Sequence, residues 1–326
     1  MSAGIVSVGA YVPARAVTNS DLEPLTGLKA TWIRERTGIE ERRHCAKDED
    51  VVTMAHKAVA NACARAGIAV GDIDAVVTST NTPTFIMPGL GARLMAQSGL
   101  TPRSAPVDIV GPGCAGAVSV LQVGEQLVRS GVKLVAVVQS EASSTFMDFD
   151  DISPQSALAA SIFGDGACCW LLRPCRPGSG IVYSSSRTVP EGYEGLVLQG
   201  QNLRGFSMDA RAVKGFAIKQ VPALIRDLEA GSGSAVRDAG LVLLHQANLR
   251  LIESVLAGLD VPMSRTCTTV QDLGNTASAS VGISAARAID AGLIQPGVTV
   301  FLAGFGSGWT TAGSVLRWCG SSDFDL

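Results

Sequence analysis

Short apolar runs recur along this chain, and each ends in a glycine-rich or polar turn that leads into a stretch with helical spacing. Continuous apolar runs of roughly four to eight residues are typical of strands that are buried on both faces. The alternation of such strands with helices predicts an α/β fold with mostly parallel sheets covered by helices. The clearest runs are residues 106–110, 134–138, 241–244 and 298–302.

The apolar runs and turns occur in the same order in two halves of the chain. Residues 72–81 resemble residues 238–247, and each segment contains an apolar run that ends at polar residues. The turn at residues 113–117 resembles residues 274–278, and each leads into a helical stretch rich in small residues. The chain therefore contains an internal repeat.

The boundary between the repeats is marked by a cluster of turn-forming residues, namely Pro174, Pro177, Gly178 and Gly180. We therefore expect an N-terminal half, residues 1–173, and a C-terminal half, residues 174–326, of similar fold. In open α/β folds, ligands bind at the C-terminal ends of the strands. Equivalent strand ends of two related sheets can therefore converge on one site.

The composition is that of a well-buried enzyme and not of a disordered or coiled-coil protein. The chain has 326 residues, of which 47% are hydrophobic and only 17% charged, and it contains 36 glycines. The net charge of −3 and the lack of any Lys- and Arg-rich run give no indication of a nucleic-acid partner. The apolar runs are far shorter than the roughly 18–20 residues of a membrane span, and the first residues read directly into a strand. We therefore expect a cytoplasmic enzyme with no membrane or nucleic-acid partner.

The eight cysteines do not predict a metal site. None of them belongs to a Cys-x-x-Cys pair, and the chain has only three histidines to complete a zinc site. Cys168 and Cys169 are adjacent in an apolar run, so we expect them on opposite faces of a strand. Buried, reduced thiols of a cytosolic protein explain all of the cysteines except Cys114, which lies in an unusual turn.

Cys114 lies in a tight turn between an apolar strand and a predicted helix. The strand covers residues 106–110, and the helix covers roughly residues 115–130. At the N-terminus of a helix, the positive end of the helix dipole lowers the pKa of a thiol and favours the thiolate. The flanking Gly113 and Gly116 permit a sharp turn and the close approach of a thioester. These features predict that Cys114 is a nucleophile.

The same turn also has the glycine spacing of a dinucleotide-binding loop. Gly111, Gly113 and Gly116 form the pattern Gly-x-Gly-x-x-Gly after a strand and before a helix. The acidic residue expected about 20 positions further on is missing, and the acid of the next strand, Glu141, lies roughly 30 positions away. The pattern is also not in the first strand–helix unit of the chain. A nucleotide-binding oxidoreductase therefore remains only a remote alternative.

Two further polar residues stand at turns of the C-terminal half. His245 ends the apolar run 241–244, and the chain becomes polar directly after it. Asn275 occupies the position of the repeat that corresponds to Cys114. A histidine at a strand end and an asparagine in a turn are often structural. Together with the thiol, however, they form the set of groups that can load an acyl group onto sulfur and then stabilise an enolate.

A third glycine-rich turn, residues 304–309, follows the apolar run 298–302 and reads Gly-Phe-Gly-Ser-Gly-Trp. Such a turn can direct backbone N–H groups at a developing oxyanion. It can equally be a simple tight turn, and the residues alone leave both interpretations open.

At these residues the chain resembles the β-ketoacyl-acyl-carrier-protein synthase III family of thiolase-fold condensing enzymes, over essentially its full length. The Cys-His-Asn triad of that family matches Cys114 in Gly-Cys-Ala-Gly, His245 in His-Gln-Ala-Asn-Leu-Arg and Asn275 in Gly-Asn-Thr-Ala-Ser. Elongating synthases use two histidines and thiolases use a second cysteine, so the triad separates this chain from both. Supporting matches are Trp32-Ile33, Arg36-Thr37-Gly38-Ile39 and Phe163-Gly164-Asp165-Gly166-Ala167.

The resemblance implies a five-layer α-β-α-β-α thiolase fold built from two pseudo-symmetric repeats, and a homodimer. It also implies a two-step reaction without a metal or cofactor, because a CoA thioester is itself the substrate. An acyl-CoA would load Cys114, and malonyl-acyl-carrier protein would then lose CO2 and attack the acyl-enzyme. His245 and Asn275 would hydrogen-bond the malonyl thioester carbonyl, and the N–H groups of Cys114 and Ser307 would form the oxyanion hole.

The resemblance also implies a binding path for CoA. Trp32 and Arg36 match the clamp for the CoA nucleotide, in which an indole stacks on adenine and a cation meets phosphate. Asn248 matches a position beside the pantetheine arm. The family usually carries an arginine that helps to bind adenine in the segment that corresponds to residues 144–151, but this chain has none there. We therefore expect CoA to bind in a different manner or more weakly.

Carrier-protein and acyl-pocket residues follow from the same resemblance. Arg250 matches a carrier-protein contact. The carrier-protein lysine of the family aligns with Gly215, and Lys214, the candidate in this chain, lies one residue away, which is a rotation of about 100° around a helix. Phe305 is expected at the acyl pocket, and Met87 stands where the family often has an aromatic residue that reaches into the acyl tunnel of the partner subunit.

Such departures are typical of branches of the family that serve specialised metabolism. Members of these branches load unusual acyl groups, and some pass them to another nucleophile without condensation. The first alternative function is therefore an acyltransferase that uses Cys114 with a non-malonyl oxygen, nitrogen or sulfur acceptor. A non-catalytic scaffold is disfavoured because the triad is intact. The chain length of the acyl group and the choice between CoA and carrier protein stay open.

Overall fold

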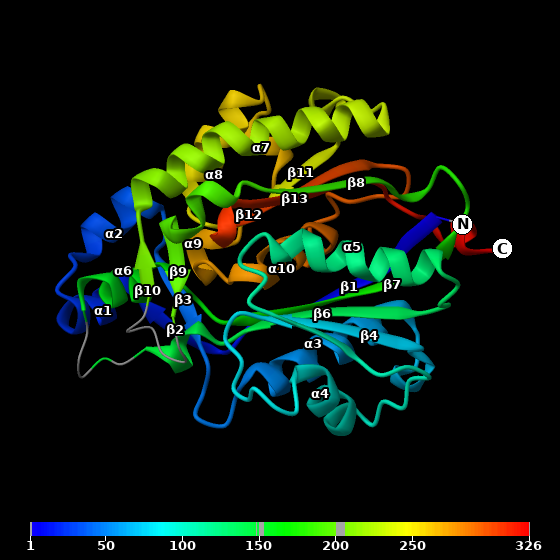
Figure 1. Ribbon diagram of the computed structural model, residues 1–326, viewed down its shortest axis with the longest axis horizontal. Coiled ribbons are helices and arrows are strands. Elements are labelled where there is room, and N and C mark those ends of the chain that lie inside the picture. Colours follow the sequence, from blue (N-terminus) through cyan, green and yellow to red (C-terminus); the bar gives the residue numbers. More distant parts are fainter. Residues whose placement is uncertain (1, 148, 150–152, 200–205, 326) are drawn as a thin grey trace.

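In the computed structural model, residues 2–147, 149, 153–199 and 206–325 are described. Within these ranges the chain forms two main sheets that are separated and covered by layers of helices (Figure 1). Both termini lie at the same end of the molecule, away from the helices α1 (Asn19–Thr26) and α2 (Ala30–Thr37).

The first sheet is built from the N-terminal half and has the strand order β1-β7-β6-β4-β5. β4 pairs in parallel with β5 and β6, whereas β7 pairs antiparallel with β6 and β1. Every residue of β4 and β6 is buried, as the continuous apolar runs predict. The strands are β1 (Ser2–Tyr11), β4 (Ala75–Thr80), β5 (Val107–Val110), β6 (Val135–Glu141) and β7 (Gly166–Cys175).

The second sheet has the strand order β11-β12-β13-β8 and is built from the C-terminal half. β11 and β12 are parallel, but β13 pairs antiparallel with both β12 and β8. The prediction of mostly parallel sheets is therefore wrong, because both sheets are mixed. The turn between β12 and β13 is too short for a crossover, so these two strands can only be antiparallel. The strands are β8 (Gly180–Thr188), β11 (Leu241–Leu244), β12 (Thr299–Gly306) and β13 (Thr310–Arg317).

Three layers of helices complete the architecture. α3 (Val51–Ala66) and α4 (Leu90–Ser98) cover the outer face of the first sheet. α5 (Gly116–Arg129) and α10 (Ser280–Asp290) lie between the sheets. α7 (Ala210–Ser232) and α8 (Leu249–Gly258) cover the outer face of the second sheet. This is the five-layer α-β-α-β-α arrangement that the resemblance implies.

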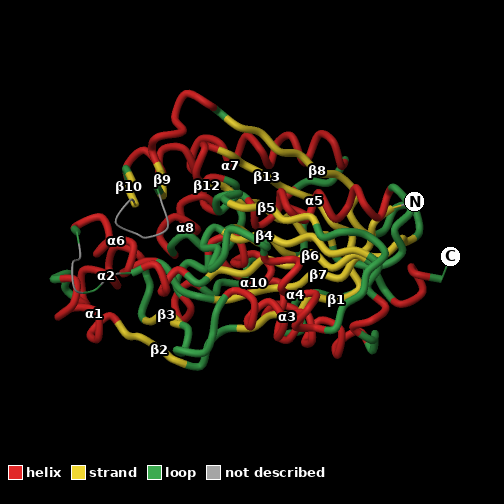
Figure 2. Tube along the Cα trace, turned by 60° about the horizontal axis from the view of Figure 1, so that its bottom comes forward, coloured by secondary structure: helices red, strands yellow, loops and turns green. Residues whose placement is uncertain are grey.

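The remaining elements lie mostly at the end of the molecule opposite the termini. Figure 2 shows β9 and β10 there, beside α6 and apart from the two main sheets. The elements are β2 (Arg15–Thr18), β3 (Glu41–His44), β9 (Leu196–Leu198), β10 (Phe206–Met208), α6 (Pro154–Ile162) and α9 (Val270–Leu273). No helix in the described part of the chain is both long and apolar enough to cross a lipid bilayer.

β7 shows how the layers share the hydrophobic core. Cys168 and Trp170 belong to the apolar cluster that surrounds α5 and α10. Cys169 and Leu171 point to the other face and pack in the cluster of α3. This alternation confirms the prediction that the two adjacent cysteines lie on opposite faces of one strand. All eight cysteines of the chain are buried and free.

The repeat has a clear structural counterpart. α5 follows the turn that contains Cys114, α10 follows the turn that contains Asn275, and both helices lie in the central layer. The strands of the first sheet lie within residues 2–175, and those of the second lie within residues 180–317. The division of the chain at residue 173 stays a prediction.

Candidate active site

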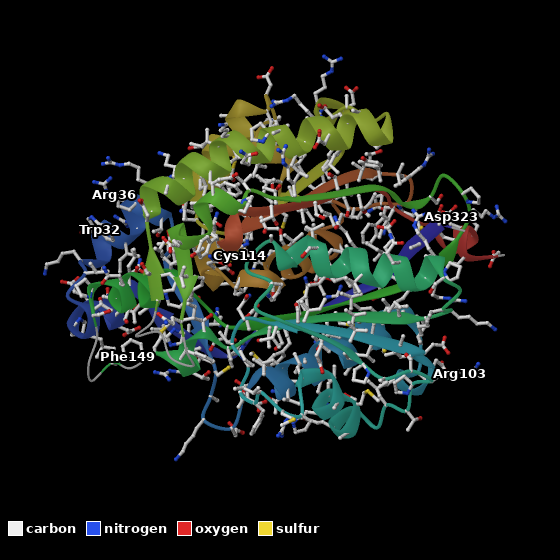
Figure 3. All side chains as sticks on the ribbon, in the orientation of Figure 1. Trp32, Arg36, Arg103, Cys114, Phe149 and Asp323 are labelled. Carbon is white, nitrogen blue, oxygen red and sulfur yellow. The ribbon has the colours of Figure 1, made fainter. Side chains whose placement is uncertain are left out.

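A cavity of about 410 Å³ opens beside α2 and α8, and its lining includes Cys114, His245 and Asn275. Figure 3 shows Cys114 well inside the outline of the molecule, whereas Trp32 and Arg36 lie near its edge on the side of α2. A second cavity of about 80 Å³ also borders Cys114. The structure therefore brings the three predicted triad residues to one cavity, with Cys114 at its junction with a smaller one.

Cys114 lies in the turn that leads from β5 into α5. Gly111 and Gly113 have positive φ angles of 70° and 62°, which explains why the turn is rich in glycine. The N–H of Gly113 donates a 2.8 Å hydrogen bond to the side-chain oxygen of Asn81, at the end of β4. The thiol is only 8% exposed and shares a hydrogen bond with the side chain of Asn275.

The prediction of a lowered thiol pKa is wrong. Burial, together with the negative charge of Glu141, raises the pKa of Cys114 to about 12, although the hydrogen bond from Asn275 acts in the opposite direction. A buried thiolate loses most of its hydration, and here that loss outweighs the favourable position before the first turn of α5. The turn thus places the thiol at the cavity, but it does not stabilise the thiolate form.

His245 directly follows β11 and is fixed on both its backbone and its ring. Its N–H donates to the carbonyl of Ala303 at 2.8 Å, and its Nδ1 lies 2.8 Å from the hydroxyl of Ser280, the first residue of α10. The N–H of Gln246 donates to that same hydroxyl oxygen at 3.4 Å, which leaves the hydroxyl hydrogen available to Nδ1. A hydroxyl hydrogen directed at Nδ1 requires the ring proton on Nε2. Burial lowers the pKa of His245 to about 3, which keeps the imidazole neutral.

Asn275 lies between α9 and the helical turn Ala277–Ala279. Its side-chain oxygen accepts a 2.8 Å hydrogen bond from the N–H of Ala277, a residue held at a positive φ of 44°. Because the oxygen is occupied, the amide nitrogen is the group that faces Cys114. Asn275 and His245 are thus both arranged as hydrogen-bond donors.

The segment 163–167 supports the loop of Asn275. The N–H of Asn275 donates to the carbonyl of Ile162 at 2.8 Å, and the N–H of Gly164 donates to the carbonyl of Asn275 at 3.1 Å. A Cβ atom at Gly164 would clash with the carbonyl oxygen of Leu273, so this close pairing requires glycine. The match of this segment to the family therefore has a structural reason.

The glycine-rich turn after β12 packs directly against the nucleophile. A Cβ atom at Gly306 would lie 2.6 Å from the backbone nitrogen of Cys114, and one at Gly113 would lie 3.3 Å from the backbone nitrogen of Ser307. In the described part of the chain, the N–H of Cys114 donates to no protein acceptor. The N–H groups of Cys114 and Ser307 are thus close together, as an oxyanion hole requires.

The residues expected along the CoA and carrier-protein path also border the large cavity: Trp32, Arg36, Lys214, Asn248 and Arg250. The side chain of Asn248 caps α8 by accepting from the N–H of Leu251 at 2.8 Å. Arg250 forms an ion pair with Glu253 one helical turn further on.

The two residues expected at the acyl pocket, Phe305 and Met87, have different surroundings. Phe305 packs edge-on against His245, with ring centroids 5.3 Å apart, and borders the large cavity and not the small one. Met87 borders neither cavity and is 86% exposed. In the segment that lacks the expected arginine, residues 144–151, positions 148, 150 and 151 lie outside the described residues.

Sequence reasoning missed the polar residues behind the triad. Glu141 and Asn81 lie at the ends of β6 and β4, and Ser278 lies just beyond Asn275. The sequence does carry a signal for Glu141 and Asn81, because a polar residue at the C-terminal end of a buried parallel strand often belongs to a binding site. For Ser280, the partner of His245, a serine at the start of a small-residue helix carries no such signal.

Comparison with known families agrees with this geometry. A family model described as 3-oxoacyl-[acyl-carrier-protein] synthase III matches residues 108–190, and the model of its C-terminal part matches residues 230–318. The β-ketoacyl-[acyl-carrier-protein] synthase III of Bacillus pumilus is 34% identical over 319 residues, which is 98% of this chain and 99% of the relative. That of Geobacillus kaustophilus is 35% identical over 320 residues, with the same coverage.

Solved structures show the same relationship. The synthase III of Thermus thermophilus superposes with a TM-score of 0.90 at 33% identity and covers 98% of this chain and 100% of its own. A priming β-ketosynthase from a polyketide biosynthetic pathway superposes with a TM-score of 0.88 at 28% identity, covering 98% of this chain and 96% of its own. These findings favour a condensing enzyme over both the oxidoreductase and the non-condensing acyltransferase. The chain belongs to the β-ketoacyl-acyl-carrier-protein synthase III family and is an acyltransferase-type condensing enzyme with the thiolase fold.

Proposed function

We propose that this protein condenses an acyl group from acyl-CoA with malonyl-acyl-carrier protein, with Cys114 as the nucleophile. The observation that supports this most strongly is the shared cavity of Cys114, His245 and Asn275, with Asn275 hydrogen-bonded to the thiol and Nδ1 of His245 held by Ser280. A buried thiol beside two neutral donors suits covalent acyl transfer followed by enolate stabilisation. The predicted absence of a cofactor follows from this scheme and stays a prediction.

In the first step, the sulfur of Cys114 attacks the thioester carbonyl of acyl-CoA. A new carbon–sulfur bond forms to the enzyme, the bond to CoA breaks, and the proton of Cys114 leaves with CoA as its thiol. Because burial raises the pKa of Cys114 to about 12, loss of this proton accompanies the attack and does not precede it. The N–H groups of Cys114 and Ser307 stabilise the charge on the carbonyl oxygen.

In the second step, the malonyl thioester loses CO2 and the resulting enolate attacks the acyl carbon. The neutral His245, through Nε2–H, and Asn275, through its amide N–H, donate hydrogen bonds to the thioester oxygen on which charge develops, and both keep their protons. A carbon–carbon bond forms, the bond to the sulfur of Cys114 breaks, and the sulfur takes up a proton from water. The product is a β-ketoacyl thioester on the carrier protein.

The two cavities suit the two parts of the acyl donor. Trp32, Arg36 and Asn248 border the large cavity near its opening and are proposed to hold CoA, with Arg250 and Lys214 as contacts for the carrier protein. The small cavity beyond Cys114 is the proposed acyl pocket. Its apolar lining is Phe163, Leu196, Val197, Leu198 and Phe206.

A second copy of the chain is the proposed partner at β5. This strand is the edge of the first sheet, and an unpaired edge offers N–H and C=O groups to another strand. Val110 on this edge is 62% exposed, and Phe85, Ile86 and Met87 in the preceding loop are exposed as well. An apolar surface of this kind is typical of a protein interface. In such a homodimer, Met87 would reach the acyl pocket of the partner.

Intact-protein mass spectrometry tests the proposal. The protein is mixed with a panel of acyl-CoAs, and malonyl-acyl-carrier protein is then added. We expect an acyl adduct that maps to Cys114, is lost on addition of the malonyl substrate, and gives a β-ketoacyl product. Cys114→Ala abolishes the adduct, whereas Cys63→Ala, which removes a buried thiol of α3, keeps it. An adduct on another cysteine contradicts the nucleophile, and an adduct that malonyl-carrier protein cannot discharge contradicts the condensation.

A further inference from the structure

A fully buried carboxylate lies directly behind the active site. Glu141 is the last residue of β6, and its side chain is 0% exposed. It accepts hydrogen bonds from the N–H and side-chain amide of Asn81 at 2.9 and 2.7 Å, from the hydroxyl of Thr82 at 3.3 Å, and from the N–H and hydroxyl of Ser278. In the described part of the chain no cation pairs with it, so its charge is balanced by neutral donors alone.

These hydrogen bonds connect Glu141 to both halves of the catalytic machinery. On one side, the side-chain oxygen of Asn81 accepts from the N–H of Gly113, the residue before Cys114. On the other side, Ser278 belongs to the turn Ala277–Ala279, whose first N–H holds the side-chain oxygen of Asn275. One carboxylate therefore lies between the turn of Cys114, in the first repeat, and the loop of Asn275, in the second.

Burying a carboxylate without a cation is costly, because the surrounding dipoles replace its hydration only in part. A hydrophobic residue of similar volume would avoid that cost, but it would leave the donors of Asn81 and Ser278 without an acceptor. The two oxygens of the carboxylate together receive donors from Asn81 and from Ser278 at once. The hydrogen bonds that it accepts from Asn81 and Ser278 thus explain why a carboxylate is buried at this position.

We propose that Glu141 is a positioning residue that fixes the Cys114 turn and the Asn275 loop relative to each other, through Asn81 on one side and Ser278 on the other. This inference rests on the proposed function, because it concerns the alignment of the nucleophile with the donors of the second step. A displacement of about 1 Å between reacting groups can lower a rate roughly 100-fold, so a rigid connection between the two loops has a direct effect on turnover.

The charge of Glu141 supplies a readout that a purely structural role does not share. Two titratable groups face Cys114: Glu141 from β6, and His245 after β11, whose imidazole is neutral because burial lowers its pKa. The negative charge of Glu141 raises the pKa of the thiol, second to burial. Removal of this charge therefore makes Cys114 easier to ionise while it loosens the two loops.

The experiment compares Glu141→Gln with the unaltered protein in two assays on Cys114. The first is alkylation by iodoacetamide across neutral and alkaline pH, and the second is single-turnover acylation by acyl-CoA. We expect alkylation to become roughly threefold faster or more, with its profile moved to lower pH. We expect acylation to become roughly 10–100-fold slower, because the turn is no longer held in place.

Glu125→Gln is the matched control, because Glu125 is also a buried glutamate but lies on α5, where it pairs with Arg129. It should leave both rates within about threefold of the original. Equal acylation in Glu141→Gln and in the unaltered protein overturns the proposal, and so does a parallel loss of alkylation and acylation in that variant.

Two further variants keep the carboxylate in place and test each connection separately. Asn81→Ala should slow acylation of Cys114 more than malonyl decarboxylation, and Ser278→Ala should do the opposite. If both variants slow the two steps equally, the two-sided connection is wrong. If the unaltered protein accepts no acyl group at all, the proposed function fails, whereas the alkylation profiles still show whether Glu141 acts on Cys114.

Discussion

Replacement of Ser280 by alanine tests how the catalytic imidazole is held. The hydroxyl of Ser280 is the one hydrogen-bond partner that the ring of His245 has among the described residues, at 2.8 Å from Nδ1. Both side chains are buried, so water does not replace the lost hydroxyl. Without it, Nδ1 has no donor facing it, and the ring is free to carry its proton on Nδ1. Nε2 then no longer donates to the thioester oxygen.

The expected loss of decarboxylation rate follows from the single hydrogen bond that the substitution removes. Loss of a neutral hydrogen bond in a buried site costs about 1–2 kcal/mol. Since about 1.4 kcal/mol corresponds to a tenfold change in rate, malonyl decarboxylation should fall roughly 5–30-fold. Acylation of Cys114 does not use the Nε2 proton in the proposed scheme, so it should stay within about threefold of the original rate.

The assay measures CO2 release from malonyl-acyl-carrier protein and, separately, the acyl adduct on Cys114. Ser284→Ala is the control, because Ser284 lies one turn further along α10, is equally buried, and donates its hydroxyl to the carbonyl of Cys267. It should lower the free energy of unfolding to a similar extent but leave CO2 release unchanged. Undiminished decarboxylation in Ser280→Ala, or an equal loss in both variants, refutes the assigned role of the hydroxyl.

Two further predictions concern the packing and the charge of the site. Gly306→Ala would place a Cβ atom 2.6 Å from the backbone nitrogen of Cys114, so kcat/KM should fall by about 100-fold. Steady-state kinetics should show no such loss for Gly258→Ala, which meets no atom within 4 Å. Burial raises the pKa of Glu141 from 4.5 to about 7, so the native state binds this proton more tightly than the unfolded chain does. The stability of the protein relative to Glu141→Gln should therefore fall as the pH rises from 4.5 to 7, by up to about 1.4 kcal/mol per pH unit, in denaturant titrations.

The sequence predicts well those features that depend on local patterns. The strand Leu241–Leu244 and the position of His245 directly after it could be read from an apolar run that stops at polar residues. The turns of Cys114 and Asn275 could be matched through the repeat, because each combines a glycine-permitted bend with the start of a buried helical stretch. Strand direction could not be predicted in this way. The apolar run of β13 does not show that this strand pairs antiparallel with both β12 and β8.

The electrostatics of the site were mispredicted because burial is a property of the whole fold. The helix dipole at the start of α5 predicts a more acidic thiol at Cys114. The surrounding sheets and helices, however, exclude water from this thiol, and the burial raises its pKa. The same reasoning explains why Glu141 and Ser280 were missed. Their importance arises from partners that lie far away in the chain, Ser278 and His245, and only the fold brings them together.

The shifts of the three buried groups have a common cause and a common consequence. Burial raises the pKa of Cys114 to about 12 and that of Glu141 to about 7, and it lowers the pKa of His245 to about 3. Each change favours the neutral form of the group, so at neutral pH Cys114 and His245 are neutral and Glu141 is the one group of the three that carries part of a negative charge. In the proposed mechanism, charge then develops mainly on the thioester oxygen of the substrate, where His245 and Asn275 would donate hydrogen bonds. Donors that the fold already holds in place stabilise that charge without a reorganisation of water.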